Sequence, residues 1–299
     1  MAAIPKRAST IILVRKIGVG GFEVFLVKRR EKSRFMAGNF VFPGGMVDSL
    51  DAAPETLRLT RGLASRDAGL LLNGPPGDAL GHLVAGIREL FEEAGVLLAC
   101  NAEGDLVRPD GTRDLQGLRQ ALRSGSVTFA QLLEQECLFL ALDKLHYYAH
   151  WITPEFRPLR FDARYFIAVH PDWQEATPDN DEITEGRWLE PAAAFRENLQ
   201  GSMVISPPVL TTIEDLAAYR SLEELLASPG QREVGPILPV LAVIRGEESN
   251  VLPWDPDYER FRQGEIDDAM DHGRICALGD GMTRLVLQDG RWLPFRKER

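Results

Sequence analysis

The sequence predicts an α/β sandwich, in which a mixed sheet carries a long helix on one face. Short apolar runs rich in β-branched residues, at 10–15 and 161–170, indicate strands. Between them, residues 78–94 repeat apolar side chains at the three- and four-residue spacing of an amphipathic helix. Strands and helices that alternate along one chain are typical of the α/β class.

The N-terminal part of the chain predicts a hairpin followed by a third strand. Residues 10–15 form the first strand, a glycine-rich turn occupies 18–21, and residues 22–28 return as the second strand. After a charged, irregular stretch, residues 40–42 are predicted as a further short strand. Three strands therefore precede the first helix.

Two helices are predicted next. Residues 54–72 have helical spacing, and the Asn-Gly-Pro-Pro-Gly run at 73–77 ends that helix. The second helix extends from about 78 to 94, with Gly95 as its C-terminal stop. Its apolar stripe, which we expect to face the core, consists of Leu83, Val84, Ile87, Leu90, Phe91 and Ala94.

The rest of the chain alternates between helices and short strands. Residues 112–136 predict two short helices broken at Ser124 and Gly125. The other expected elements are strands at 151–154 and 161–170, a helix over 207–226, and short strands within 237–244, 274–278 and 284–287.

Composition and charge exclude several classes of protein. The 299 residues, 44% of them apolar, suffice for one enlarged globular domain or a domain with an appendage. A formal net charge of −10 argues against binding to nucleic acid or to an anionic membrane, and no apolar run reaches the length of a membrane span. The three cysteines lack metal-ligand spacing and suit a reducing compartment. We therefore expect a cytoplasmic protein.

Three carboxylates share one turn of the helix predicted at 78–94. Residues three and four apart are neighbours on a helix, so Glu89, Glu92 and Glu93 converge. Arg88 can contact Glu92 but cannot neutralise all three carboxylates. Hard divalent cations such as Mg²⁺ prefer several oxygen ligands of this kind. The cluster therefore predicts a metal site, with a solvated charged face as the alternative.

A glycine pair upstream supports the metal site. The strand predicted at 40–42 stops at Pro43, and Gly44 and Gly45 follow it. Adjacent glycines permit a sharp turn whose backbone approaches a ligand closely. A glycine carbonyl of this turn is therefore a candidate oxygen ligand.

These two segments together resemble the sequence box of the Nudix hydrolases. That box is a Gly, five residues, a Glu, seven residues, and then Arg-Glu-aliphatic-any-Glu-Glu-any-Gly-aliphatic. Residues 88–96 match the second half without exception, and the first half matches from Gly45 to Asp51, with Asp in place of Glu. Between the halves lie the 36 residues 52–87, where the family has seven, so the role of Asp51 stays open.

The resemblance implies a division of the chain. It implies the α/β/α Nudix fold over residues 8–200, with an insertion at about 52–80 and the helical segment at about 112–136. Residues 201–299 would form a C-terminal extension of helix and strands packed on that domain.

The resemblance also implies roles for the clustered residues. Glu92 and Glu93 would bind Mg²⁺ or Mn²⁺, with the Gly44 carbonyl as a further ligand. Glu89 would be a ligand or a general base, and Arg88 would orient it through a charge-assisted hydrogen bond. Ions held in this way bridge the oxygens of a diphosphate and lower the pKa of a bound water.

An acidic loop at 179–185 offers one more metal ligand. It lies just before the strand predicted at 188–191, and Nudix proteins often take a further acidic residue from a distant loop. We favour Glu182 over Glu185, and an ordinary solvated acidic loop is the alternative.

Residues before the box indicate a substrate class. Nudix enzymes that act on coenzyme A carry a pattern there that includes Arg, then Arg, Gly and Phe-Pro-Gly-Gly at fixed spacings. This chain keeps Arg29, Arg34, Gly38 and the Phe-Pro-Gly-Gly at 42–45. It departs from the pattern at Phe25, Val27 and Arg30.

A subgroup of the family resembles this chain more specifically. It includes animal peroxisomal coenzyme A diphosphatases, has a long insertion inside the box, and shows a Trp-any-Thr-Pro stretch followed by an Arg-Phe-Asp strand. Here these are residues 151–154 and 160–162. Arg160 is thus a candidate phosphate ligand, with structural pairing as the alternative. Because residues 296–299 carry no peroxisomal address, we expect a cytoplasmic, bacterial-type relative.

The implied function is metal-dependent hydrolysis of the pyrophosphate bond of a nucleoside diphosphate derivative. Coenzyme A or an acyl-coenzyme A is the first expectation for this small-molecule partner. ADP-ribose or a nucleotide sugar is the enzymatic alternative, and a Nudix-fold sensor that binds nucleotides without hydrolysis is the non-catalytic one. A homodimer is a further expectation from the family.

Overall fold

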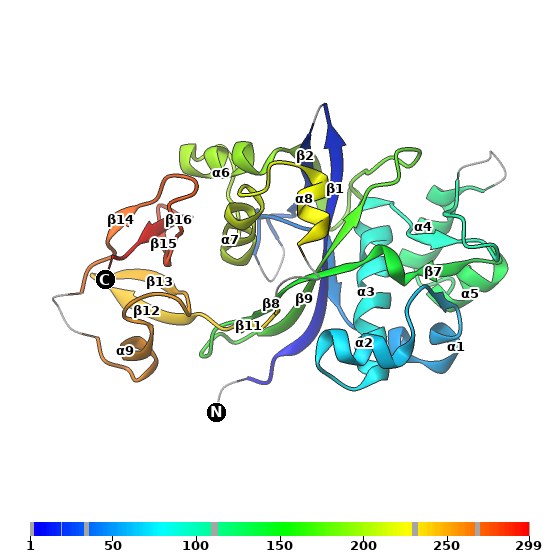
Figure 1. Cartoon of the computed structure of the whole chain (residues 1–299), viewed down its shortest axis with the longest axis horizontal. Helices are drawn as coiled ribbons and strands as arrows, with labels where there is room; N and C mark the ends of the chain where they lie inside the picture. The colour runs from blue at the N-terminus through cyan, green and yellow to red at the C-terminus, as the bar shows by residue number, and fades with distance from the viewer. Residues whose placement is uncertain are drawn as a thin grey trace.

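The computed structural model describes residues 3–18, 20–32, 36–108, 113–228, 233–266 and 270–298. Figure 1 shows a sheet edge-on in the middle of the molecule, with helices on both sides and a second sheet beyond one helical layer. The predicted α/β/α sandwich is confirmed.

The central sheet is mixed. Its strand order is β10-β2-β1-β9-β8-β11, while β3 pairs with β2 and β4 pairs with β1. The β1–β9 and β11–β8 pairs are parallel and the other pairs antiparallel. The strands are β1 Lys6–Ile17, β2 Gly21–Arg29, β3 Phe40–Val41, β4 Gly44–Met46, β8 His146–Ile152, β9 Phe161–Val169, β10 Ile183–Leu189 and β11 Pro236–Ile237.

Strand β1 shows why the sheet needs a layer on each face. Successive side chains of a strand point to opposite faces. Ile11 and Leu13 belong to one hydrophobic core, Ile12 and Val14 to the other, and all four are fully buried. A strand that is apolar on both sides must be covered on both sides.

The first helical layer contains the helix that carries the carboxylates. This helix, α3, begins with Pro76 and ends at Gly95, which takes a left-handed conformation with φ +73°. Its predicted apolar stripe is buried in the first core. The other helices of this layer are α1 Pro54–Leu57, α2 Ser65–Leu72, α4 Leu115–Arg123 and α5 Phe129–Gln135, and α3 itself is Pro76–Ala94.

The prediction of one helix over 54–72 was wrong. Short helices η1 Ser49–Ala52 and α1 are followed by strand β5 Thr60–Arg61 and only then by α2. Strand β5 pairs with β7 Phe139–Ala141, which also pairs with β6 Ala99–Cys100. A second 3₁₀ helix, η2, covers Leu142–Lys144. The two helices predicted within 112–136 are confirmed as α4 and α5.

The second helical layer consists of α6 Pro191–Gln200, α7 Pro207–Leu216 and α8 Leu222–Ala227. The helix predicted over 207–226 is therefore two helices. The second one begins after Ser221, whose side chain accepts a hydrogen bond from the Glu224 N–H as a helix cap. The sequence analysis did not predict α6, although Pro191 marks its first turn and Gly201, at φ +80°, its end.

The C-terminal residues form a five-stranded antiparallel sheet. Glu214 of α7 ties it to the second layer by accepting hydrogen bonds from the N–H groups of Gly281 (3.1 Å) and Met282 (2.9 Å). The strands of this sheet are β12 Val240–Ile244, β13 Glu247–Val251, β14 Arg274–Ile275, β15 Arg284–Gln288 and β16 Arg291–Arg296. Helix α9 Tyr258–Arg262 lies between β13 and β14 in the chain. No helix within the described residues is long and apolar enough to cross a bilayer.

Candidate active site

The glycine turn lies directly against the carboxylates of α3. Strand β4 pairs with β1 so closely that a β-carbon on Gly44 would lie 2.3 Å from the Ser9 carbonyl oxygen. A β-carbon on Gly45 would lie 2.5 Å from the Glu89 carboxylate. The N–H of Gly44 donates a 2.8 Å hydrogen bond to Glu93 Oε2. Only glycine fits this approach, as the sequence predicts.

Arg88 joins both halves of the motif. Its Nε and Nη2 donate to the two carboxylate oxygens of Asp51 at 2.8 and 2.9 Å, a bidentate pair. Its Nη1 donates to Glu89 (2.8 Å) and Glu92 (3.1 Å), and Nη2 also reaches the Met46 carbonyl. Arg88 therefore fixes Glu89, as the sequence analysis expects, and contacts Glu92 as well.

Asp51 is a full member of this cluster despite the insertion. Its side chain is 2% exposed and also accepts a 2.7 Å hydrogen bond from the Asp48 N–H. The chain leaves at Asp51 and returns at α3 with the two ends of the motif still in contact. The question that the sequence left open is thus answered for the geometry. Of the 36 intervening residues, 52–75 leave the site and 76–87 already belong to α3, and Asp51 stays in contact with Arg88.

Burial shapes the electrostatics of the carboxylates. Burial raises the pKa of Glu89 to about 7, and the neighbouring charge of Glu92 adds to the rise against the opposing effect of Arg88. Burial and the charge of Glu89 raise the pKa of Glu93 well above its usual value, and Glu182 contributes to that rise. Burial alone would lower the pKa of Arg88, but Asp51, Glu89 and Glu92 raise it overall.

This donor set fits a hard divalent cation. Two buried carboxylates with raised pKa values, next to a third on the same turn, are relieved by positive charge and supply the oxygen ligands that Mg²⁺ and Mn²⁺ prefer. Within the described part of the chain, no three His, Cys, Asp or Glu side chains already converge as a ready-made metal site.

Two residues from other elements act on this cluster through their charge. Arg29, at the end of β2, lowers the pKa of Glu93 by its charge, and its buried Nε has no hydrogen-bond partner among the described atoms. Glu182 is exposed, immediately precedes β10, and acts on the same carboxylate. Glu185 lies further along β10, beside Arg187.

Arg160, a predicted phosphate ligand, is not brought to the cluster. Arg160 is 6% exposed, and its Nε and Nη1 donate to the carbonyls of Thr153 (3.0 Å) and Ala3 (2.8 Å). These bonds give Arg160 a structural role beside the first residues of the chain, so we no longer include it in the site. Arg34 lies outside the described residues.

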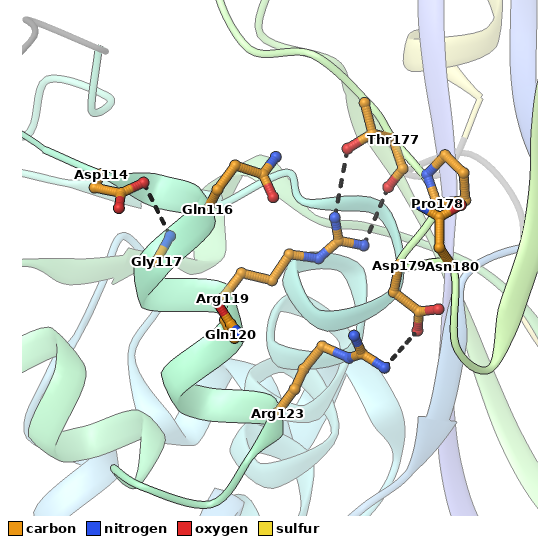
Figure 2. Close-up of a pocket in the computed structure, with 10 residues that line it drawn as sticks. All are labelled: Asp114, Gln116, Gly117, Arg119, Gln120, Arg123, Thr177, Pro178, Asp179 and Asn180. Atoms are coloured by element: carbon orange, nitrogen blue, oxygen red, sulfur yellow. Dashed lines mark hydrogen bonds and ion pairs between the residues drawn. The ribbon is translucent and has the colours of Figure 1, made fainter.

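A polar cavity of about 740 Å³ adjoins the carboxylate end of α3. Figure 2 shows that Arg119 and Arg123 extend from α4 toward the loop at 177–180, which forms the opposite wall. Arg119 also donates a hydrogen bond to the carbonyl of Glu92. Neither arginine is predicted as a site residue from the sequence, although their spacing of four residues on a predicted helix places them on one face.

Comparison with known proteins agrees with this geometry. Residues 5–216 match the family model of the NUDT19 Nudix domain. The acyl-coenzyme A diphosphatase NUDT19 of Xenopus laevis is 25% identical over 90% of this chain and 82% of its own length. The human protein of the same name is 27% identical over 69% of this chain and 63% of its own length.

A solved structure shares the fold. The crystal structure of a NUDIX hydrolase from Alicyclobacillus acidocaldarius superimposes with a TM-score of 0.63, covering 78% of this chain and 99% of that protein at 23% identity. The family match spans most of the chain, and the motif residues are assembled in space. The chain therefore belongs to the Nudix hydrolases, in the group of the NUDT19 Nudix domain, and is a Nudix-type pyrophosphohydrolase.

Proposed function

We propose that this enzyme hydrolyses the pyrophosphate bond of coenzyme A or an acyl-coenzyme A with the help of Mg²⁺ or Mn²⁺. The observation that carries the proposal is the cluster in which Asp51, Arg88 and the three glutamates of α3 meet the turn at Gly44 and Gly45. The names of the NUDT19 relatives support the substrate class. The Arg29 and Phe-Pro-Gly-Gly pattern before the box supports it independently.

The proposed roles combine what the family resemblance implies with the contacts of Arg88. Glu92, Glu93 and the Gly44 carbonyl hold the metal, and Glu182 adds a ligand from the loop before β10. Glu89 is a ligand or the general base, and Arg88 orients it. Arg29, whose Nε has no partner among the described atoms, binds a phosphate of the substrate. When bound, the metal neutralises charge on the diphosphate and provides a water of lowered pKa.

The overall reaction adds one water across the P–O–P bond. Coenzyme A would give 3′-phosphoadenosine 5′-phosphate and 4′-phosphopantetheine, and an acyl derivative would give the acylated phosphopantetheine. As the general base, Glu89 would accept a proton from the attacking water.

The test is a substrate comparison with product identification. Coenzyme A, an acyl-coenzyme A, ADP-ribose and a nucleotide sugar are each incubated with Mg²⁺ or Mn²⁺ and with the metal removed by EDTA. We expect metal-dependent turnover that is fastest for the coenzyme A substrates. No turnover of either coenzyme A substrate would overturn the substrate class, and faster turnover of ADP-ribose or the nucleotide sugar would favour that alternative.

The variant Glu93→Gln separates an enzyme from a nucleotide-binding sensor. The amide still accepts a hydrogen bond from Gly44 but removes the charge, so we expect turnover to fall by about a thousandfold or more while the fold is kept. A wild-type protein that binds nucleotides with no turnover would instead be a sensor.

Three further proposals concern the whole chain. We propose a Nudix domain over 8–200 with residues 201–299 as a packed extension, a homodimer, and a cytoplasmic location. Light scattering during size-exclusion chromatography measures the oligomeric state, and a fluorescent fusion in the native host measures the location.

A further inference from the structure

Two arginines of α4 both point at the loop that precedes β10. Arg119 and Arg123 are four residues apart, and Figure 2 shows them side by side, with their guanidinium groups directed at Thr177 and Asp179. Helix α4 lies outside the Nudix motif. The loop leads into Glu182, so α4 touches both parts of the candidate metal site.

Arg119 bridges the box helix and this loop. It is 4% exposed, and its Nε donates to the carbonyl of Glu92 at 2.8 Å, while Nη2 donates to the carbonyl of Thr177 at 3.1 Å. The N–H of Thr177 in turn donates to the Ala94 carbonyl. A β-carbon on Gly95 would lie 3.0 Å from Arg119 Nη1, so the glycine that ends α3 also leaves room for the guanidinium.

Arg123 holds the next part of the loop through Asp179. Its Nη2 lies 3.2 Å from Asp179 Oδ2, and the Asp179 side chain is 2% exposed. The other oxygen of Asp179 accepts the N–H groups of Asp181 (2.6 Å) and Ile183 (3.0 Å). These two amides flank Glu182. A buried carboxylate that organises a turn in this way depends on its cationic partner.

We propose that Arg119 and Arg123 are positioning residues that hold the turn carrying Glu182 against Glu92 and Glu93. Arg119 bonds groups on both sides of the gap, the carbonyls of Glu92 and Thr177, and Arg123 holds Asp179 within the loop. Helix α4 therefore helps to set the distance between the two ligand-bearing segments, together with the backbone bonds from Thr177 to Ala94 and from Arg30 to Glu182. The effect of the two arginines on metal binding rests on the proposed function. Their effect on the position of the loop rests only on the contacts of α4.

The experiment compares Arg123→Gln with Glu182→Gln and with the double variant. Hydrogen exchange of the amides at 181–183 reports the turn, and paramagnetic resonance of Mn²⁺ reports metal affinity without substrate. We expect faster exchange and about tenfold weaker Mn²⁺ binding for Arg123→Gln. The double variant should bind Mn²⁺ no more weakly than Glu182→Gln alone, because both changes act through the same ligand.

Arg113→Gln is the matched control. It breaks an ion pair between α4's N-terminal side and Glu136 that does not involve the loop, so exchange at 181–183 and Mn²⁺ affinity should stay at the wild-type level.

Arg119→Lys is a second test of the proposal. It keeps the charge but cannot make the forked bridge, and we expect it to resemble Arg123→Gln.

Two results would overturn the proposal. One is unchanged exchange at 181–183 in Arg123→Gln. The other, in a protein that binds Mn²⁺, is unchanged Mn²⁺ affinity or a double variant whose losses multiply. If the wild-type protein binds no Mn²⁺, the proposed function fails on that measurement. The exchange data still decide whether Arg123 holds the turn at 181–183.

Discussion

The part of the insertion that precedes α3, residues 52–75, and helix α4 both lie beside α3, but at opposite ends of it (Figure 1). The insertion interrupts the motif in sequence, yet its helices pack near the first half of α3, where Gly81 contacts Ala52. Helix α4 follows the motif and reaches its carboxylate end, where Arg119 contacts Glu92. Proximity to the motif along the chain therefore does not predict proximity to the chemistry.

The two regions also differ in the kind of contact they make. The insertion contributes apolar side chains such as Leu59, Ala68 and Leu72 to the first core. Helix α4 also adds Leu122 to that core, but in addition it contributes charged forks to backbone carbonyls and to a buried carboxylate. We infer that the insertion adds stability to the domain, whereas α4 sets the geometry of the active site. The predictions below test that division.

The largest effect on stability is expected at Asp51, where the insertion leaves the site. Asp51→Ala removes the partner of a mostly buried arginine, so we expect a loss of about 3–5 kcal/mol in the free energy of unfolding. Glu89 loses its orientation as Arg88 relaxes, so kcat should fall about 10–100-fold. Chemical denaturation and steady-state kinetics measure the two losses.

Asp48→Ala is the control for that change. Asp48 is exposed and caps the same short helix by accepting the Leu50 N–H, so its loss should cost only about 0.5–2 kcal/mol and little activity. Equal losses in the two variants would mean that the turn matters and the contact with Arg88 does not.

The second effect is a pH dependence of stability in EDTA. The pKa of Glu89, about 7, is higher in the folded protein than in the unfolded chain, so the fold binds this proton more tightly. Its contribution is present below about pH 4.5 and is lost as pH rises through 7, by roughly 1–3 kcal/mol. Glu89→Gln removes this dependence and should be the more stable protein at pH 8, as measured by denaturant titration.

His82 acts in the same pH range with the opposite sign. Burial lowers its pKa to about 4, so its contribution is full above about pH 6.5 and is lost as pH falls. The quantity to measure is therefore the difference between wild type and Glu89→Gln at each pH, in which the His82 contribution cancels. A difference that does not change between pH 5 and 8 would contradict the raised pKa of Glu89.

The third effect concerns the glycine turn. Gly45→Ala places a methyl group 2.5 Å from the Glu89 carboxylate, and the flexible end of that side chain must move. We expect kcat to fall about tenfold or more, with a modest loss of about 1–3 kcal/mol in stability. Gly77→Ala, at the insertion end of α3, meets no atom within 4 Å and should keep wild-type kinetics. Similar activity in both variants would exclude the close contact.

Local sequence features predicted the parts of this molecule that depend on local interactions. The helical spacing of 78–94, the stop at Gly95 and the glycine turn each appear in the structure because a few neighbouring residues determine them. The helix predicted over 54–72 failed for the opposite reason. Strand β5 forms only because it pairs with β7, some 80 residues later, and no local pattern records such a partner.

The charged residues show the same limit at the site. In the sequence, Arg119 and Arg123 are only two charged residues on one face of a helix. Their partners become apparent in the fold, which brings Thr177 and Asp179 opposite them. Arg160 read as a phosphate ligand because its partners, the carbonyls of Ala3 and Thr153, leave no signal in side-chain identity. Residue type gives the chemistry that a side chain can perform, and the fold decides which partner receives it.

The smallest effect is expected on the outer face of the insertion. Leu70 of α2 is 70% exposed, and the described chain places α2 beside the N-terminal half of α3, away from the carboxylates. Leu70→Ser should change the free energy of unfolding by no more than about 0.5 kcal/mol and leave kcat and KM within twofold of wild type. A large rise in KM for an acyl-coenzyme A, with kcat and stability unchanged, would mean that the insertion binds the acyl chain. That result would contradict the inference that the insertion contributes only stability, because the insertion and α4 would then both act on the active site.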